Sequence, residues 1–237
     1  CDIALHGDTH FGSANCADDS VDEMLAWVME KPNRRFVHMG DAIEAITTDD
    51  KRYQHRDDDT PIPLLQCKSV VSRYRAARKR GLVWLMGNHE FTLHRFGNLA
   101  EHMANELGIP YGQWTTKLDL HDKHGRIGKI FLAHGVGHVL NSNAKDYEQR
   151  VANMKASVKM RLVHKAADCI VMGFGHTHKL LVVDPAQRLI LTDDGEQLHH
   201  KYLGAGDGAA DYIEPDRRWY VNTGSFLRTY ALDDSSY

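Results

Sequence analysis

The sequence lacks long apolar runs, paired cysteines and an excess of one charge. No apolar run approaches the ~18–20 residues that a membrane-spanning helix requires, so we expect no membrane partner. The four cysteines lie far apart without a C-x-x-C pair, which favours reduced thiols and a cytoplasmic location over a disulfide framework. Lys and Arg number 29 against 32 for Asp and Glu, so the net charge of −3 creates no global basic field for nucleic acid.

Internal repeats and low-complexity tracts are also absent. With 237 residues, of which 42% are hydrophobic, the chain can bury the core of one large α/β domain. We therefore predict a single domain over residues 1–237, and no oligomeric state follows from the sequence. The chain starts at Cys1, inside a predicted strand and without an initiator Met, so we expect both ends to be trimmed.

Short apolar runs alternate with longer helix-period stretches in the first half of the chain, which is the pattern of βαβ units. The runs predict strands over Asp2–His6, Arg35–Met39 and Leu82–Met86. The longer stretches predict helices over Ser20–Glu30, Pro63–Arg80 and Leu93–Leu107.

The second half is richer in strands. A polar turn separates two strands that we expect to pair, Thr116–Leu120 and Lys129–Ala133, and a long helix is predicted over Ala144–Ala166. Further strands are predicted over Cys169–Met172, Leu180–Val183, Arg188–Thr192, Gln197–Tyr202, Trp219–Asn222 and Phe226–Ala231. This order predicts two sheets packed together with helices outside them.

Histidine is unusually abundant, with sixteen in the chain, and several histidines belong to polar motifs that directly follow predicted strands. The carboxyl ends of strands in open α/β sheets are where ligands and catalysis are expected, and glycine in each motif allows a close approach of the backbone. Five motifs share this position: Gly7-Asp8-Thr9-His10, Gly40-Asp41, Gly87-Asn88-His89, His134-Gly135 and Gly175-His176-Thr177-His178.

The side chains of these motifs form one coherent set of metal donors. Carboxylate, amide and imidazole groups without a thiolate suit Mn²⁺, Fe or Zn²⁺ better than a structural zinc cluster. A two-metal centre built from them binds a phosphoryl oxygen and activates water for in-line displacement. Each motif alone is most often a turn or a surface feature. All five in one order, each after a strand, argue against coincidence.

The order D-x-H, G-D, G-N-H-E, H-G and G-H-x-H resembles the calcineurin-like metallophosphoesterases, and Tyr220–Ser225 (YVNTGS) is similar to their closing strand. The resemblance implies a four-layer α/β/β/α sandwich of two mixed sheets flanked by helices. It also implies two divalent metal ions per chain, with Mn²⁺ as the first choice and Fe, Zn²⁺ or Ni²⁺ as alternatives.

The resemblance also assigns the ligands motif by motif, with Asp41 bridging the two ions. The first ion would be held by Asp8, His10, Asp41 and His178, and the second by Asp41, Asn88, His134 and His176. His89, which is not a ligand, would be the general acid that protonates the leaving oxygen. Glu90 would either orient His89 or simply be an acidic residue at the start of a helix.

The substrate is less well defined by the sequence. After Gly40-Asp41 the chain continues with Ala42-Ile43-Glu44 rather than the Asp-Arg-Gly of protein phosphatases, which weakens a serine/threonine phosphatase assignment. Asp8–Gly12 is similar to the DNA-repair nucleases of the superfamily. The Gly40-Asp41-x-x-Glu44 pattern looks like the lipid-precursor pyrophosphohydrolases, but those carry Arg where His89 stands.

We therefore predict a metal-dependent phosphoric ester hydrolase that is a phosphodiesterase, with nucleases included, and whose substrate is a phosphoester such as a nucleotide or nucleic acid. A phosphomonoesterase is the alternative. A non-catalytic metal-binding scaffold is disfavoured, because such proteins tend to lose His89 or a ligand.

Two surface features complete the prediction. The basic run Arg73–Arg80 would either contact nucleic-acid phosphates or form a solvated helix face. The charge-rich stretch Thr47–Pro61 is predicted to be a surface insertion near the active site, with a merely solvated loop as the alternative.

Overall fold

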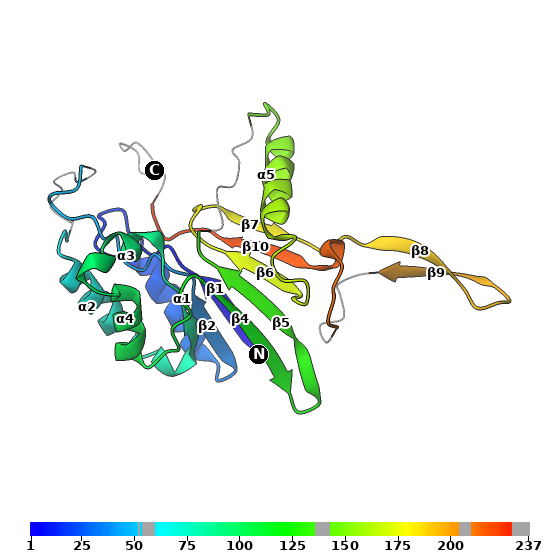
Figure 1. Cartoon of the computed structure of the whole chain (residues 1–237), viewed down its shortest axis with the longest axis horizontal. Coiled ribbons are helices and arrows are strands. Elements are labelled where there is room, and N and C mark those ends of the chain that lie inside the picture. The colour runs from blue at the N-terminus through cyan, green and yellow to red at the C-terminus, as the bar shows by residue number, and fades with distance from the viewer. Residues whose placement is uncertain (52, 54–59, 136–142, 204–209, 229–237) are drawn as a thin grey trace.

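The computed structural model describes residues 1–51, 53, 60–135, 143–203 and 210–228, and it has a mixed α/β fold in which sheets are flanked by helices (Figure 1). The first sheet contains β1 (Asp2–His6), β2 (Arg34–His38) and β3 (Gly81–Trp84) in that order, and both of its strand pairs are parallel. The strands are short and apolar, as expected for a sheet that is covered on both faces.

The second sheet has five strands in the order β4-β5-β6-β10-β7. Its members are β4 (Thr115–Asp122), β5 (Gly125–Ala133), β6 (Val171–Phe174), β10 (Trp219–Thr223) and β7 (Leu180–Val183). The central strands β5, β6 and β10 run parallel, while β4 and β7 at the two edges are antiparallel to their neighbours.

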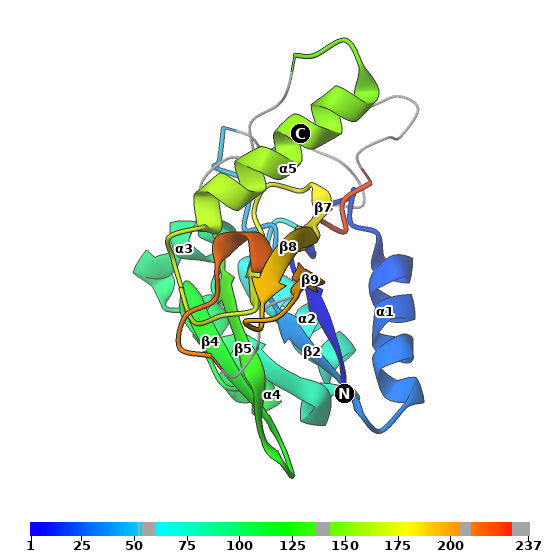
Figure 2. The same cartoon turned by 90° about the vertical axis from the view of Figure 1, so that its right-hand side faces the viewer.

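A separate two-stranded ribbon is formed by β8 (Arg188–Asp193) and β9 (Leu198–Leu203). It projects from the body to the right in Figure 1 and toward the viewer in Figure 2.

The helices pack in two places. Helices α1 (Asp18–Glu30), α2 (Pro63–Tyr74), α3 (Asn88–Thr92) and α4 (Leu99–Leu107) follow strands of the first half, and α5 (Tyr147–Leu162) stands over the second sheet (Figure 1). Three short 3₁₀ turns complete the described elements, at Arg78–Arg80, His94–Phe96 and Pro215–Arg217.

Three apolar clusters hold these elements together. The largest lies between the first sheet and α1, α2 and α4, and includes Val28, Val70 and Trp84. The second joins the two sheets and includes Val37 from β2 and Leu132 from β5. The third packs α5 on β6, β7 and β10. Burial of this apolar surface, at about 25 cal/mol per Å², is the main stabilising contribution to the fold.

Several predicted boundaries were wrong. The helix predicted over Pro63–Arg80 ends at Tyr74, because hydrogen bonds from Ala77 to Tyr74 and from Arg80 to Ala77 tighten the chain into a 3₁₀ turn before β3. The helix predicted over Leu93–Leu107 begins only at Leu99, where the Asn98 side chain caps it by accepting from the Glu101 N–H.

The strand predicted over Phe226–Ala231 is not formed within its described part, residues 226–228. Leu227 makes a single bridge with Cys16 there, and residues 229–231 lie outside the described residues. The polar-turn prediction was correct, since β4 and β5 pair as a hairpin.

All four cysteines are free thiols, as predicted. No helix among the described residues is both long and apolar enough to cross a membrane. Residues 52 and 54–59 of the predicted insertion Thr47–Pro61 lie outside the described residues. The end of the insertion is described, and there the Thr60 N–H donates to the Gly12 carbonyl at 3.0 Å. That bond brings the end of the insertion beside the segment that follows His10.

Candidate metal centre

Each of the five polar motifs follows a strand, and the two sheets bring them to one place. Asp8 and His10 follow β1, and Asp41 follows β2. The His134 Nδ1–H, directly after β5, donates to the Met39 carbonyl at 2.7 Å and so ties the carboxyl edge of the second sheet to that of the first. The prediction that these motifs converge at the carboxyl ends of the strands is therefore correct.

The first group of potential ligands contains Asp8, His10, Asp41 and His178, with one ligand atom from each lying within 4.8 Å of all the others. The Nε2 atoms of His10 and His178 are 3.1 Å apart, and His178 Nε2 lies 3.4 Å from Asp8 Oδ1. Asp8, His10 and Asp41 are fully buried, whereas the His178 side chain is 21% exposed, so solvent reaches this group on the side of His178.

The second group contains Asp41, His134 and His176, again within 4.8 Å. His134 Nε2 lies 3.2 Å from Asp41 Oδ2 and 3.1 Å from Asn88 Oδ1. Asp41 thus belongs to both groups. All seven residues predicted as ligands are brought together here.

The donor set fits divalent cations. Since the Nδ1–H of His134 is used by the Met39 carbonyl, a neutral His134 presents a lone pair at Nε2. Two further acceptors, on Asp41 and Asn88, face that lone pair. Buried acceptors that face one another without a donor are unfavourable unless a proton or a cation lies between them.

Without a cation, a proton shared by His134 and Asp41 would serve the same purpose. Burial acts to lower the pKa of His134, but the Asp41 carboxylate outweighs it and raises the pKa to about 9. Burial acts to raise the pKa of Asp41, and the neighbouring imidazoles, His134 foremost, hold it well below its usual range. A divalent cation would displace the shared proton.

Five of the predicted ligands have a left-handed backbone conformation, with φ of 52° at Asp8, 51° at His10, 51° at Asp41, 81° at His176 and 55° at His178. Only two other non-glycine residues in the described part of the chain, Ala45 and Gln113, share it. Such conformations cost about 1–3 kcal/mol each and gather at functional sites.

Glycine at two positions makes room for the carboxylates. A Cβ atom on Gly87 would lie 2.0 Å from Asp41 Oδ1, and one on Gly175 would lie 2.7 Å from Asp8 Oδ2. Any other residue would displace the carboxylates, so the close approach expected of these glycines is present.

His89 lies at the edge of the first group. Its backbone N–H donates to Asp41 Oδ1 at 2.9 Å, its Nδ1 lies 2.5 Å from the Glu44 carbonyl oxygen, and its ring meets the ring of His10 edge-on at 4.5 Å. The ring is therefore held beside the centre by partners other than Glu90.

Glu90 is an acidic residue at the start of a helix, which is one of the two roles predicted for it. Its carboxylate accepts from the N–H groups of Ala42, Ile43 and Gly87, which fixes the turn after Asp41 and caps the start of α3. None of the hydrogen bonds described for its carboxylate reaches His89, so of the two alternatives the structure favours the acidic residue at the start of the helix. Burial, followed by the nearby Asp41, raises the pKa of Glu90 to about 7.

Sequence reasoning missed one site residue, Glu44. It is buried, and its Oε2 lies 2.9 Å from His10 Nδ1. The pattern Gly-Asp-x-x-Glu was a signal for it, but the spacing alone does not show which side chain the glutamate meets.

The basic run Arg73–Arg80 approaches the segment after His10 only through Arg73, whose guanidinium lies 5.0 Å from the centre of the Phe11 ring, among the described contacts. Arg73 pairs with Asp18 and Asp22, and the turn Arg78–Arg80 precedes β3, whose opposite end leads to the site. The solvated-face interpretation therefore fits the structure better.

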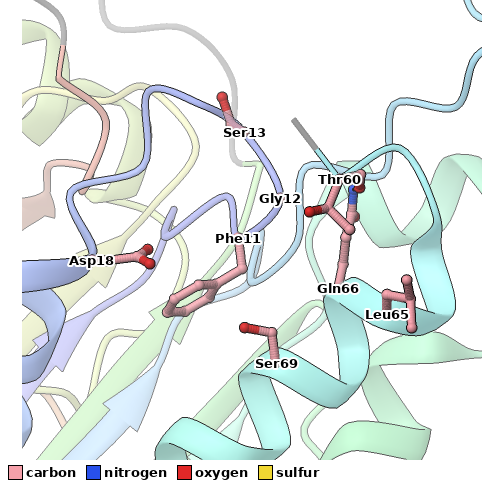
Figure 3. Close-up of a pocket in the computed structure, with 8 residues that line it drawn as sticks. All are labelled: Phe11, Gly12, Ser13, Asp18, Thr60, Leu65, Gln66 and Ser69. Carbon is pink, nitrogen blue, oxygen red and sulfur yellow. The ribbon is translucent and has the colours of Figure 1, made fainter. Parts of the chain in front are cut away.

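A pocket of about 320 Å³ is lined in part by the segment that follows His10 (Figure 3). It is lined by Phe11, Gly12, Ser13, Asp18, Thr60, Leu65, Gln66 and Ser69. None of the predicted metal ligands lines it, so it is separate from the metal centre.

Comparisons with known proteins add little to this geometry. No protein-family model matches the sequence, and no curated protein matches it. Among solved structures, the nuclease MPE of Pseudomonas putida is similar with a TM-score of 0.37 and 12% identity, over 99% of this chain and 80% of that one. A likeness of this size carries no argument about activity, so the interpretation depends on the centre itself.

Proposed function

We propose that this chain is a dinuclear metal-dependent phosphoesterase of the calcineurin-like superfamily and that it hydrolyses a phosphodiester. The observation that carries the proposal is the place of Asp41, whose carboxylate belongs to both ligand groups. A shared carboxylate suits a two-metal centre, in which the ions lie ~3.5–4 Å apart.

The proposal includes the four-layer α/β/β/α sandwich and a single domain over residues 1–237. The three apolar clusters support it, because they separate four successive layers: the helices of the first half, the first sheet, the second sheet and α5. A cytoplasmic location stays a prediction.

Two divalent ions, with Mn²⁺ as the first choice, fit oxygen and imidazole donors without a thiolate. Such ions, when bound, act as Lewis acids on phosphoryl oxygens and acidify water. Asp8 and Asp41 offset only two of the four positive charges of such a pair, so the ligands leave the centre able to attract a phosphodiester although the chain is acidic.

His89 is the proposed general acid. Because its Nδ1–H donates to the Glu44 carbonyl, Nε2 is the nitrogen that carries the proton for the leaving oxygen. The bond from its backbone N–H to Asp41 keeps the ring next to the bridging carboxylate. General acid catalysis of this kind contributes about 10²–10⁴-fold to turnover.

The test is hydrolysis of bis-p-nitrophenyl phosphate by Mn²⁺-loaded protein, with p-nitrophenyl phosphate as the monoester and Asp211→Asn, an exposed substitution, as the control. Faster turnover of the diester supports the proposal. A preference for the monoester would indicate a phosphomonoesterase, and no turnover with both ions bound would indicate a scaffold. Single- and double-stranded DNA, RNA and cyclic nucleotides then identify the substrate class.

A further inference from the structure

Glu44 contacts two of the histidines at the centre, His10 and His89, through two different groups. Its carboxylate Oε2 lies 2.9 Å from His10 Nδ1, and its backbone carbonyl oxygen lies 2.5 Å from His89 Nδ1. The His10 side chain is fully buried and the Glu44 side chain is 5% exposed, so solvent screens their contact little.

The two nitrogens of His10 have separate partners. Nε2 lies 3.1 Å from His178 Nε2, within the group that contains Asp8 and Asp41, whereas Nδ1 lies 2.9 Å from Glu44 Oε2. An imidazole that offers its Nε2 lone pair to a cation carries its proton on Nδ1. The Glu44 Oε2 atom lies 2.9 Å from that nitrogen without hydrogen-bond geometry in the structure, and a small rotation of the ring would let it accept the proton.

The backbone explains why residue 44 reaches this place. The segment after β2 runs beside the segment after β1: the Phe11 N–H donates to the Ala42 carbonyl, and the Glu44 N–H donates to the Phe11 carbonyl, each at 3.0 Å. Ala45 then turns with a φ of 56°, and its N–H donates to the buried Gln66 side chain at 2.9 Å. Glu44 is thus held between two anchored neighbours.

We infer that Glu44 is a positioning residue, which fixes the tautomer and orientation of His10 through its carboxylate and those of His89 through its carbonyl. This inference rests on the proposed metal centre. A carboxylate behind a metal-bound histidine makes the imidazole a stronger ligand, and its loss typically weakens metal binding 10–100-fold. Because the carbonyl belongs to the backbone, substitution of the side chain affects only the His10 half of this role.

A competing arrangement must be distinguished. His10, Glu44 and His89 also bring potential ligand atoms within 4.8 Å of one another, so Glu44 could itself coordinate a cation. In that arrangement His10 would bind the cation through Nδ1 instead of Nε2. His10 would then no longer be a ligand in the group that contains His178. The two arrangements predict different stoichiometries and different metal-bound nitrogens.

The first experiment is calorimetric titration of Mn²⁺ into EDTA-stripped wild type, Glu44→Gln and Glu106→Gln, the last being an exposed glutamate of α4. We expect two ions in all three proteins, with one bound 10–100-fold more weakly in Glu44→Gln alone. Unchanged affinity would overturn the inference, and so would the loss of one ion from the stoichiometry. A wild type that binds no Mn²⁺ would instead contradict the proposed function.

The second experiment needs no variant and therefore decides the question even if Glu44→Gln does not fold. In wild type loaded with ¹¹³Cd²⁺ and labelled with ¹⁵N-histidine, His10 should show metal coupling at Nε2 and a proton on Nδ1. Coupling at Nδ1 would overturn the inference. With saturating Mn²⁺, Glu44→Gln should also keep the wild-type ratio of nucleotide to p-nitrophenyl ester turnover, since the backbone contact to His89 is retained. A changed ratio would contradict the inference that the carboxylate acts on His10 and only the carbonyl acts on His89.

Discussion

His10 and His178 are separated by 168 positions in the chain, yet their Nε2 atoms lie 3.1 Å apart in a partly buried site. Two imidazole nitrogens at this distance share either a proton or a cation. A bound cation stabilises the folded state by mass action, because the unfolded chain has no such arrangement of ligands.

Removal of metal should therefore lower the melting temperature. We expect EDTA-stripped protein to regain several degrees when Mn²⁺ is added at 100 times its dissociation constant, which corresponds to about 2.7 kcal/mol. Differential scanning calorimetry measures the shift. The same melting temperature with and without Mn²⁺ would contradict a metal site at these residues.

Substitution of the shared carboxylate should affect both ions. Asp41→Asn keeps the shape of the side chain but removes its charge, so we expect the loss of at least one ion and of nearly all activity. Elemental analysis after dialysis, together with diester hydrolysis, measures both effects. Wild-type metal content and rate in Asp41→Asn would exclude a bridging role.

The role of His89 can be separated from metal binding by the choice of leaving group. A ribose alkoxide leaves poorly without a proton, whereas p-nitrophenolate, with a pKa near ~7, leaves well. His89→Asn should keep both metals, slow a nucleotide substrate about 10²–10⁴-fold and slow p-nitrophenyl esters much less.

Asn88→Ala is the matched comparison, because it removes a predicted ligand next to His89 and should slow both reactions alike. Metal loss in His89→Asn, or equal slowing of both substrates, would make His89 a ligand or a phosphate clamp.

A buried histidine outside the ligand set should make stability depend on pH. Burial lowers the pKa of His6 to about 3, and its Nε2 lies 2.8 Å from the Tyr74 hydroxyl. The unfolded chain binds a proton near pH 6.5 and the folded protein does not, so this group costs stability as pH falls below about 6.5. Above that pH it has no effect.

Between pH 6.5 and 5.5 that loss is about 1 kcal/mol for one such group. His6→Gln should lose that much less than wild type over this interval, as measured by urea unfolding in EDTA. Equal pH dependence in both proteins would mean that His6 is protonated in the folded state.

Much of the centre could be predicted because its candidate ligands belong to short sequence motifs that directly follow strands. Asp8, Asp41 and His134 each follow a short apolar run, and parallel strands place their carboxyl ends at one edge of a sheet. These motifs, together with the family resemblance that they carry, therefore indicated the seven candidate ligands before their distances were known.

Other features depend on tertiary packing and could not be predicted. The left-handed backbone at His176 and the contact of Glu44 with His10 have no local sequence signal. The early end of α2 at Tyr74 has the same cause, since the following residues are good helix formers that turn to reach β3.

The bond from His134 to the Met39 carbonyl has a consequence for the order of folding. It joins the two sheets, so the centre can assemble only after both halves of the chain have formed their strands and docked. Contacts of such high sequence separation form late and slowly. Metal ions should consequently act after the main folding barrier, slowing the unfolding of the finished protein while leaving its rate of folding unchanged.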